Sequence, residues 1–199
     1  IVFGLSHVHL SALIDESFLN TQTAGEMFER YYSIIDISFI DRVKFDLIRY
    51  YSVYLKNMIL FYQHNHHEKY LGKYKPLNKK VENLEANIKE TIKKHYYKDN
   101  LDAKVSQISI SYLDSIVNIC SANEIQLIVV STPVNEKYYQ KIPDIILNQY
   151  ELQIKSLVRR DVRVIDYSRL YEGDSLFADA DHLIKEGSSK FTKLLKSVF

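Results

Sequence analysis

The chain has 199 residues, of which 46% are hydrophobic and 26% are charged, and its 26 Lys and Arg nearly balance its 25 Asp and Glu. This length fits one globular domain, and the composition excludes a mostly disordered, collagen-like or membrane-spanning chain. A near-zero net charge argues against a dedicated nucleic-acid binder, which needs a basic surface. Cys120 is the single cysteine, which excludes an internal disulfide and a thiolate zinc site.

The first residues carry no targeting signal. The chain opens on Ile1-Val2-Phe3, as a buried strand would, without a basic region followed by an apolar one. If a signal segment or membrane anchor stood before Ile1, a location in the bacterial cell envelope or otherwise outside the cytoplasm would be favoured. The sequence leaves the compartment and the oligomeric state open.

Short apolar or β-branched runs predict the strands of a buried sheet. They cover residues 1–6, 18–24, 34–39, 125–131 and 162–166. The run 125–131 is the strongest of these signals, because it is apolar without interruption and so fits a strand that is buried on both faces.

Amphipathic helices alternate with the predicted strands. They are expected over residues 26–33, 43–62, 81–92, 102–122, 143–157 and from Ser188 or Ser189 to the C-terminus, with Asp102 as the N-cap of the fourth. Strands that alternate with long helices indicate an α/β domain with a parallel sheet. Cys120 falls on the apolar side of its helix and is expected in the core.

Polar side chains that could perform chemistry follow several of the strands. Ligands of open α/β sheets bind beyond the carboxyl ends of the strands. Ser6 and His7 follow the first strand, Gly25 follows the second, and Asn135 follows the central one. The segment 179–182, Asp-Ala-Asp-His, lies just before the last helix. We therefore expect the functional site at this edge of the sheet.

These residue types fit nucleophilic hydrolysis. A serine becomes a nucleophile when a histidine accepts its proton and an acid holds that histidine in one tautomer. Asp179-x-x-His182 can supply the acid and the base from one loop, and Ser6 stands at a strand-to-helix turn. Asp181 is a competing acid, although a directly adjacent residue has difficulty in orienting the ring of its neighbour. Taken alone, Ser6 could simply cap the next helix, and His182 could be a surface loop residue.

The order of the blocks along the chain resembles the SGNH (GDSL-like) hydrolase family, in particular bacterial esterase and O-acetyltransferase members. The resemblance rests on residues 2–7 (VFGLSH), 23–25 (TAG), 128–134 (IVVSTPV) and 177–183 (FADADHL). It implies one three-layer α/β/α domain over residues 1–199, similar to flavodoxin in layout, with a helical insertion at about 43–104.

The same resemblance implies roles for individual residues. Ser6 would be the nucleophile, His182 the general base and Asp179 its orienting acid, and the amides of Ser6 and Gly25 would form the oxyanion hole. His7, beside the nucleophile, could face the substrate as a donor.

Two of the family's blocks differ here. The G-D-S block reads Gly4-Leu5-Ser6, and the G-x-N-D block, whose asparagine is a further oxyanion donor, has no counterpart. Ser38 is the neutral polar side chain on the strand that should carry that asparagine, and Asn135 follows a different strand.

The leading hypothesis is a serine esterase, deacetylase or O-acyltransferase that acts on an ester, by resemblance one of a carbohydrate, without a cofactor or metal and without a nucleic-acid partner. A second hypothesis is a catalytically degenerate member that binds a glycan or a protein. A third, a metal-dependent enzyme built on His64, His66, His67 and Glu68, lacks the spacing of a helical zinc motif, and a solvated polar loop explains that segment better.

Overall fold

The computed structural model describes residues 1–13, 15, 55, 77, 79–97 and 103–198. The chain divides into two compact units, one formed by residues 1–14 and 76–199 and the other by residues 15–75. The predicted strands 18–24 and 34–39, and with them Gly25 and Ser38, lie outside the described residues.

A short parallel sheet forms the centre of the first unit. Its strands are β1 (Val2–Gly4), β2 (Ile128–Ser131) and β3 (Arg163–Asp166), in the order β1-β2-β3. Val129 of the central strand pairs with Phe3 on one side and with Val164 on the other. The prediction of an α/β fold with a parallel sheet is thus confirmed for the part of the chain that the structure describes.

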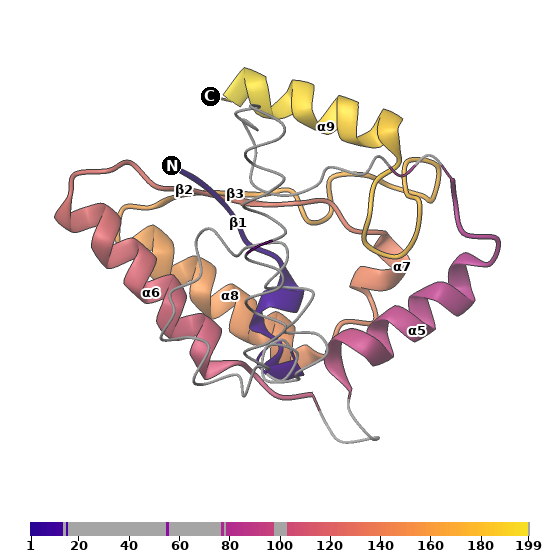
Figure 1. Ribbon diagram of the computed structural model, residues 1–199, viewed down its shortest axis with the longest axis horizontal. Coiled ribbons are helices and arrows are strands. Elements are labelled where there is room, and N and C mark those ends of the chain that lie inside the picture. The colour runs from indigo at the N-terminus through magenta and orange to yellow at the C-terminus, as the bar shows by residue number, and fades with distance from the viewer. Residues whose placement is uncertain (14, 16–54, 56–76, 78, 98–102, 199) are drawn as a thin grey trace. The chain divides into compact units, whose positions relative to one another are not determined.

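Helices pack on both faces of this sheet, because successive residues of a strand point to opposite faces. Val129 packs with residues of α6 (Gln107–Ala122) and α8 (Asp144–Arg159), and Ile128 and Val130 pack with Phe191 of α9 (Lys185–Val198). Figure 1 shows α9 above the strands and α6 and α8 below them. All residues of β2 are buried, as the uninterrupted apolar run predicts.

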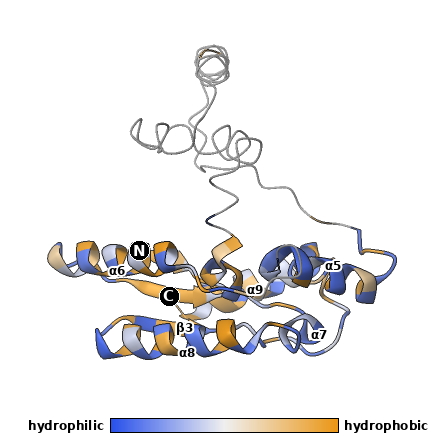
Figure 2. Cartoon of the chain, turned by 90° about the horizontal axis from the view of Figure 1, so that it is seen from below, coloured by the Kyte–Doolittle hydropathy of each residue, from blue (hydrophilic) through white to orange (hydrophobic). Residues whose placement is uncertain are grey.

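The apolar stripes of the helices face the sheet. Figure 2 shows orange and blue residues alternating along α6 and α8. Cys120 is a buried free thiol in the cluster that α6 and α8 share, as expected. No helix among the described residues is both long and apolar enough to cross a membrane.

Two predicted helix caps are wrong. The helix predicted from Asp102 begins at residue 107, because Ser106 is its N-cap and accepts a hydrogen bond from the Ser109 amide at 2.8 Å. The last helix begins at Lys185, ahead of the predicted serine cap. Ser188 already lies within this helix, and its amide donates to the Ile184 carbonyl at 2.9 Å.

A second apolar cluster stands beside the sheet. It joins α5 (Leu84–Tyr96), which Asn83 caps, to α7 (Glu136–Tyr139). Ala180 is a fully buried member of this cluster and belongs to the loop that carries the predicted acid and base. The helix predicted at 81–92 is therefore α5, and it lies in the first unit although it falls within the predicted insertion at 43–104.

Candidate active site

Ser6 is the second residue after the carboxyl end of β1. The amide of Leu5 donates to the Val130 carbonyl at 3.0 Å, so pairing with β2 continues up to the residue before the serine. The chain then turns into a short 3-10 helix, η1 (His7–Leu10). Ser6 is half-buried, and its place at the edge of the sheet is the one that the sequence predicts for the candidate nucleophile.

The loop that carries Asp179 and His182 is closed on itself. Phe177 and Leu183 pair as an antiparallel bridge, and the Ala178 amide donates to the His182 carbonyl at 2.8 Å. Ala180, at the tip, occupies the buried cluster with α5 and α7. These contacts fix the backbone on both sides of the candidate acid and base.

The tip of this loop is also held by two asparagines from other elements. The Ala180 amide donates to Oδ1 of Asn87 on α5 at 3.0 Å. The Ala180 carbonyl accepts from the backbone amide of Asn135 at 3.1 Å. Sequence analysis missed Asn87, because its helical position gives no sign of the distant loop that it holds.

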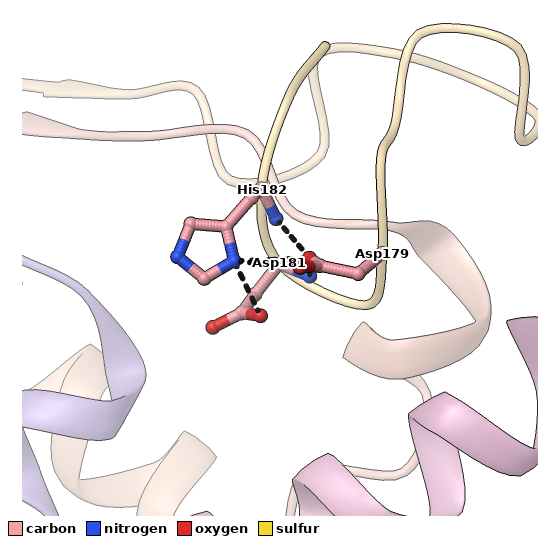
Figure 3. A group of neighbouring side chains, drawn as sticks. All are labelled: Asp179, Asp181 and His182. Atoms are coloured by element: carbon pink, nitrogen blue, oxygen red, sulfur yellow. Dashed lines mark hydrogen bonds and ion pairs between the residues drawn. The ribbon is translucent and has the colours of Figure 1, made fainter. Parts of the chain in front are cut away.

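Asp179 orients His182 directly. The imidazole Nδ1 lies 3.0 Å from Oδ1 and 3.1 Å from Oδ2 of the Asp179 carboxylate (Figure 3). The same Oδ1 accepts from the backbone amides of His182 at 2.9 Å and Asp181 at 3.1 Å. A carboxylate fixed by two amides therefore holds the ring with its proton on Nδ1, which is the arrangement that a general base needs.

Asp181 supplies a second carboxylate to the same nitrogen, with Oδ1 3.2 Å from Nδ1 of His182. The adjacent residue thus contacts the ring although we expected it to have difficulty in doing so. The hydrogen bonds of Asp179 and Asp181 raise the pKa of His182 to about 10. Burial raises the pKa of Asp179, but the hydrogen bond and the charge of His182 bring it below its ordinary value.

The second ring nitrogen of His182 points away from both carboxylates (Figure 3). The side chain is 60% exposed, so this nitrogen can reach a substrate or a serine hydroxyl that approaches it. The raised pKa means that the imidazole is mostly protonated at neutral pH. Only the neutral imidazole can accept a proton from a nucleophile, and the fraction of molecules with a neutral His182 grows as the pH rises.

Ser6 contacts a different histidine. Its backbone amide donates to Nδ1 of His9 at 3.1 Å, and its Oγ lies 3.2 Å from the same nitrogen. Among the described residues, no hydrogen bond joins Ser6 to His182. Sequence analysis missed His9, although the serine three residues before it gives the spacing of a capping box.

His7 lies in the interior. Its ring is 3% exposed and packs 4.0 Å from the Tyr150 ring and 5.2 Å from the Tyr139 ring, between centroids. Burial lowers the pKa of His7 to about 4, so the ring is neutral at physiological pH. Its Nε2 is buried without a hydrogen-bond partner among the described residues. This is the environment of a core residue rather than of a donor that faces substrate.

Asn135 is buried and caps α7. Its Oδ1 accepts from the Lys137 amide at 2.9 Å, and its Nδ2 donates to Oδ1 of Asp174 at 2.8 Å. Both ends of the side chain thus hold protein groups, and its backbone amide holds the loop at Ala180. The contacts of Asn135 are those of a residue that shapes the site. Gly25 and Ser38, the other predicted oxyanion residues, lie outside the described residues.

The loop also offers ligands for a cation. One ligand atom each from Asp179, Asp181 and His182 lies within 4.8 Å of the others, a spacing that a divalent ion could bridge. Such an ion would compete with the Asp179–His182 hydrogen bond for Nδ1. The other metal candidate, at residues 64–68, lies outside the described residues.

Comparison of the chain with protein-family models, with curated proteins and with solved structures finds no match. The functional reading therefore depends on the residue pattern and on the geometry of Ser6, Asp179 and His182.

Proposed function

We propose that the protein is a serine esterase, deacetylase or O-acyltransferase on a three-layer SGNH-like fold. The observation that carries the proposal is the Asp179–His182 pair, in which a fixed carboxylate binds Nδ1 and leaves the other ring nitrogen exposed. The position of Ser6 at the carboxyl end of β1 supports it, because the sequence blocks of the SGNH family predict a nucleophile there.

In the proposed reaction, Oγ of Ser6 attacks the carbonyl carbon of an ester, and His182 takes the hydroxyl proton. The tetrahedral oxyanion accepts from the backbone amide of Ser6. As the intermediate collapses, His182 donates its proton to the departing alcohol and an acyl-serine remains. Water or an acceptor hydroxyl then attacks this acyl group while His182 takes its proton, and His182 returns that proton to Oγ as Ser6 is released. By resemblance, the substrate is an acetylated carbohydrate.

The proposal is tested by hydrolysis of p-nitrophenyl acetate at pH 7 to 10. The parent chain is compared with Ser6→Ala and His182→Ala, and Ser189→Ala is the matched control, since Ser189 is exposed on α9. We expect turnover by the parent and the control and its loss in the other two variants. A chelator such as EDTA should leave turnover unchanged. If Ser6→Ala or His182→Ala is as active as the parent, the assignment is wrong.

A second candidate function is binding of a glycan or protein partner without turnover. It is favoured by the contact of Ser6 with His9 and by the high pKa of His182, because both disfavour attack at neutral pH. If the parent shows no turnover and no reaction with a serine-directed fluorophosphonate up to pH 10, binding becomes the better account. Titration with acetylated and deacetylated glycans would then be the next measurement.

A further inference from the structure

One imidazole nitrogen engages both functional groups of Ser6. Nδ1 of His9 accepts from the Ser6 amide at 3.1 Å and lies 3.2 Å from the Ser6 hydroxyl oxygen. Because Nδ1 accepts the amide proton, the His9 ring must be neutral and carry its own proton on Nε2. The hydroxyl proton can then point to the same lone pair.

This contact competes with the proposed reaction at two points. The Ser6 amide is the oxyanion donor that the resemblance assigns, and it cannot point fully at a substrate oxygen while it donates to His9. The hydroxyl must hydrogen-bond to His182 when it attacks, whereas here its partner is His9. Ser6 is therefore in a resting arrangement.

We propose that His9 is a positioning residue which holds Ser6 in this resting arrangement and whose ring must turn away before the serine can react. The inference rests on the proposed function. His9 is exposed, so solvent borders the residue that holds Ser6. A cap of the short η1 alone does not need a histidine, because glutamate or glutamine is the usual residue at this position of a capping box.

The choice of variants follows from that cap. His9→Ala removes the acceptor and frees both groups of Ser6. His9→Gln places an amide oxygen where it can still accept from the Ser6 amide, and so preserves the capping box. If His9 restrains Ser6, His9→Ala should be more active than His9→Gln. If His9 only holds the fold, His9→Ala should be the less active of the two.

The experiment measures the rate constant for labelling of Ser6 by a fluorophosphonate, with kcat and KM for p-nitrophenyl acetate beside it. We expect His9→Ala to be labelled roughly two- to tenfold faster than the parent, which is what release of one hydrogen bond permits. Its kcat should rise with little change in KM, and His9→Gln should stay near the parent. Nitrogen-15 NMR of the parent should show the His9 proton on Nε2.

If Ser6 of the parent is labelled, three results would overturn this inference but not the proposed function. The first is a labelling rate in His9→Ala equal to that of the parent, and the second is a slower rate in His9→Ala that His9→Gln restores. The third is a His9 ring with its proton on Nδ1. If neither the parent nor His9→Ala is labelled at Ser6, the proposed function itself fails and the inference falls with it. The Ser6→Ala variant gives the background for all of these rates.

Discussion

Acid should destabilise this protein through His7. The ring is buried and neutral in the folded state, where its pKa is about 4, but it is solvated in the unfolded chain, where a histidine has a pKa of 6.5. Between these two values the unfolded chain binds the proton and the folded protein does not. Stability from this group is therefore complete above pH 6.5 and is lost as the pH falls toward 4.

The size of this effect follows from the two pKa values. Their difference of about 2.5 is worth about 3 kcal/mol at about 1.4 kcal/mol per pKa unit. Roughly 2 kcal/mol of this would already be lost at pH 5. A typical domain is stable by about 5–15 kcal/mol, so this one ring can remove a large share of the margin.

The assay is urea unfolding of the parent and of His7→Phe at pH 7.5, 6, 5 and 4. Phenylalanine does not titrate and can still pack on Tyr150. Altered packing should lower the free energy of unfolding of His7→Phe by the same amount at every pH. From pH 7.5 to pH 4 the parent should lose about 3 kcal/mol more of its free energy of unfolding than the variant does. If the two free energies of unfolding run parallel with pH, His7 is not held neutral by burial and the reasoning is wrong.

Further changes probe the loop that carries the candidate acid and base. Asp181→Asn removes one of the two carboxylates on Nδ1, so the pKa of His182 should fall and the rise of kcat/KM with pH should move to lower pH. Asp179→Asn should instead lower kcat, by up to roughly 10⁴-fold, because the ring loses the carboxylate that two backbone amides fix and keeps only that of Asp181. Equal pH profiles of kcat/KM for these two variants would contradict their separate roles.

Packing around the glycines gives a further prediction. Gly187→Ala places a Cβ 2.7 Å from the Leu176 carbonyl oxygen and should lower the free energy of unfolding in urea by about 1–3 kcal/mol. Gly4→Ala, with nothing within 4 Å of the new Cβ, should leave it nearly unchanged.

Strands and helices with a strong apolar period were predictable. The run at residues 125–131 predicted β2, and the helix predicted at 143–157 is α8, because burial of an apolar face determines both elements. Their ends were harder to predict. Ser106 and not Asp102 caps α6, since both residue types are good caps and the choice depends on the local chain path.

The site was partly predictable for a similar reason. Asp179 and His182 are three residues apart, so one closed loop brings their side chains together and a local pattern suffices. The contacts of Ser6 with His9 and of Ala180 with Asn87 depend on side-chain orientation and on distant packing, which no spacing in the sequence encodes. Asn135 follows the central strand and was therefore expected to contact substrate. Its side chain instead hydrogen-bonds to Asp174 and to the Lys137 amide.

The central claim is that Ser6 carries the acyl group during turnover. The most direct measurement is mass spectrometry of peptides after the protein is mixed with p-nitrophenyl acetate at pH 9 and quenched in acid. The account predicts an acetyl group on the peptide that contains Ser6, and its absence in Ser6→Ala. In His182→Ala the acetyl group should form far more slowly. Turnover without an acetyl group on Ser6, or with one on another residue in its place, would contradict the account.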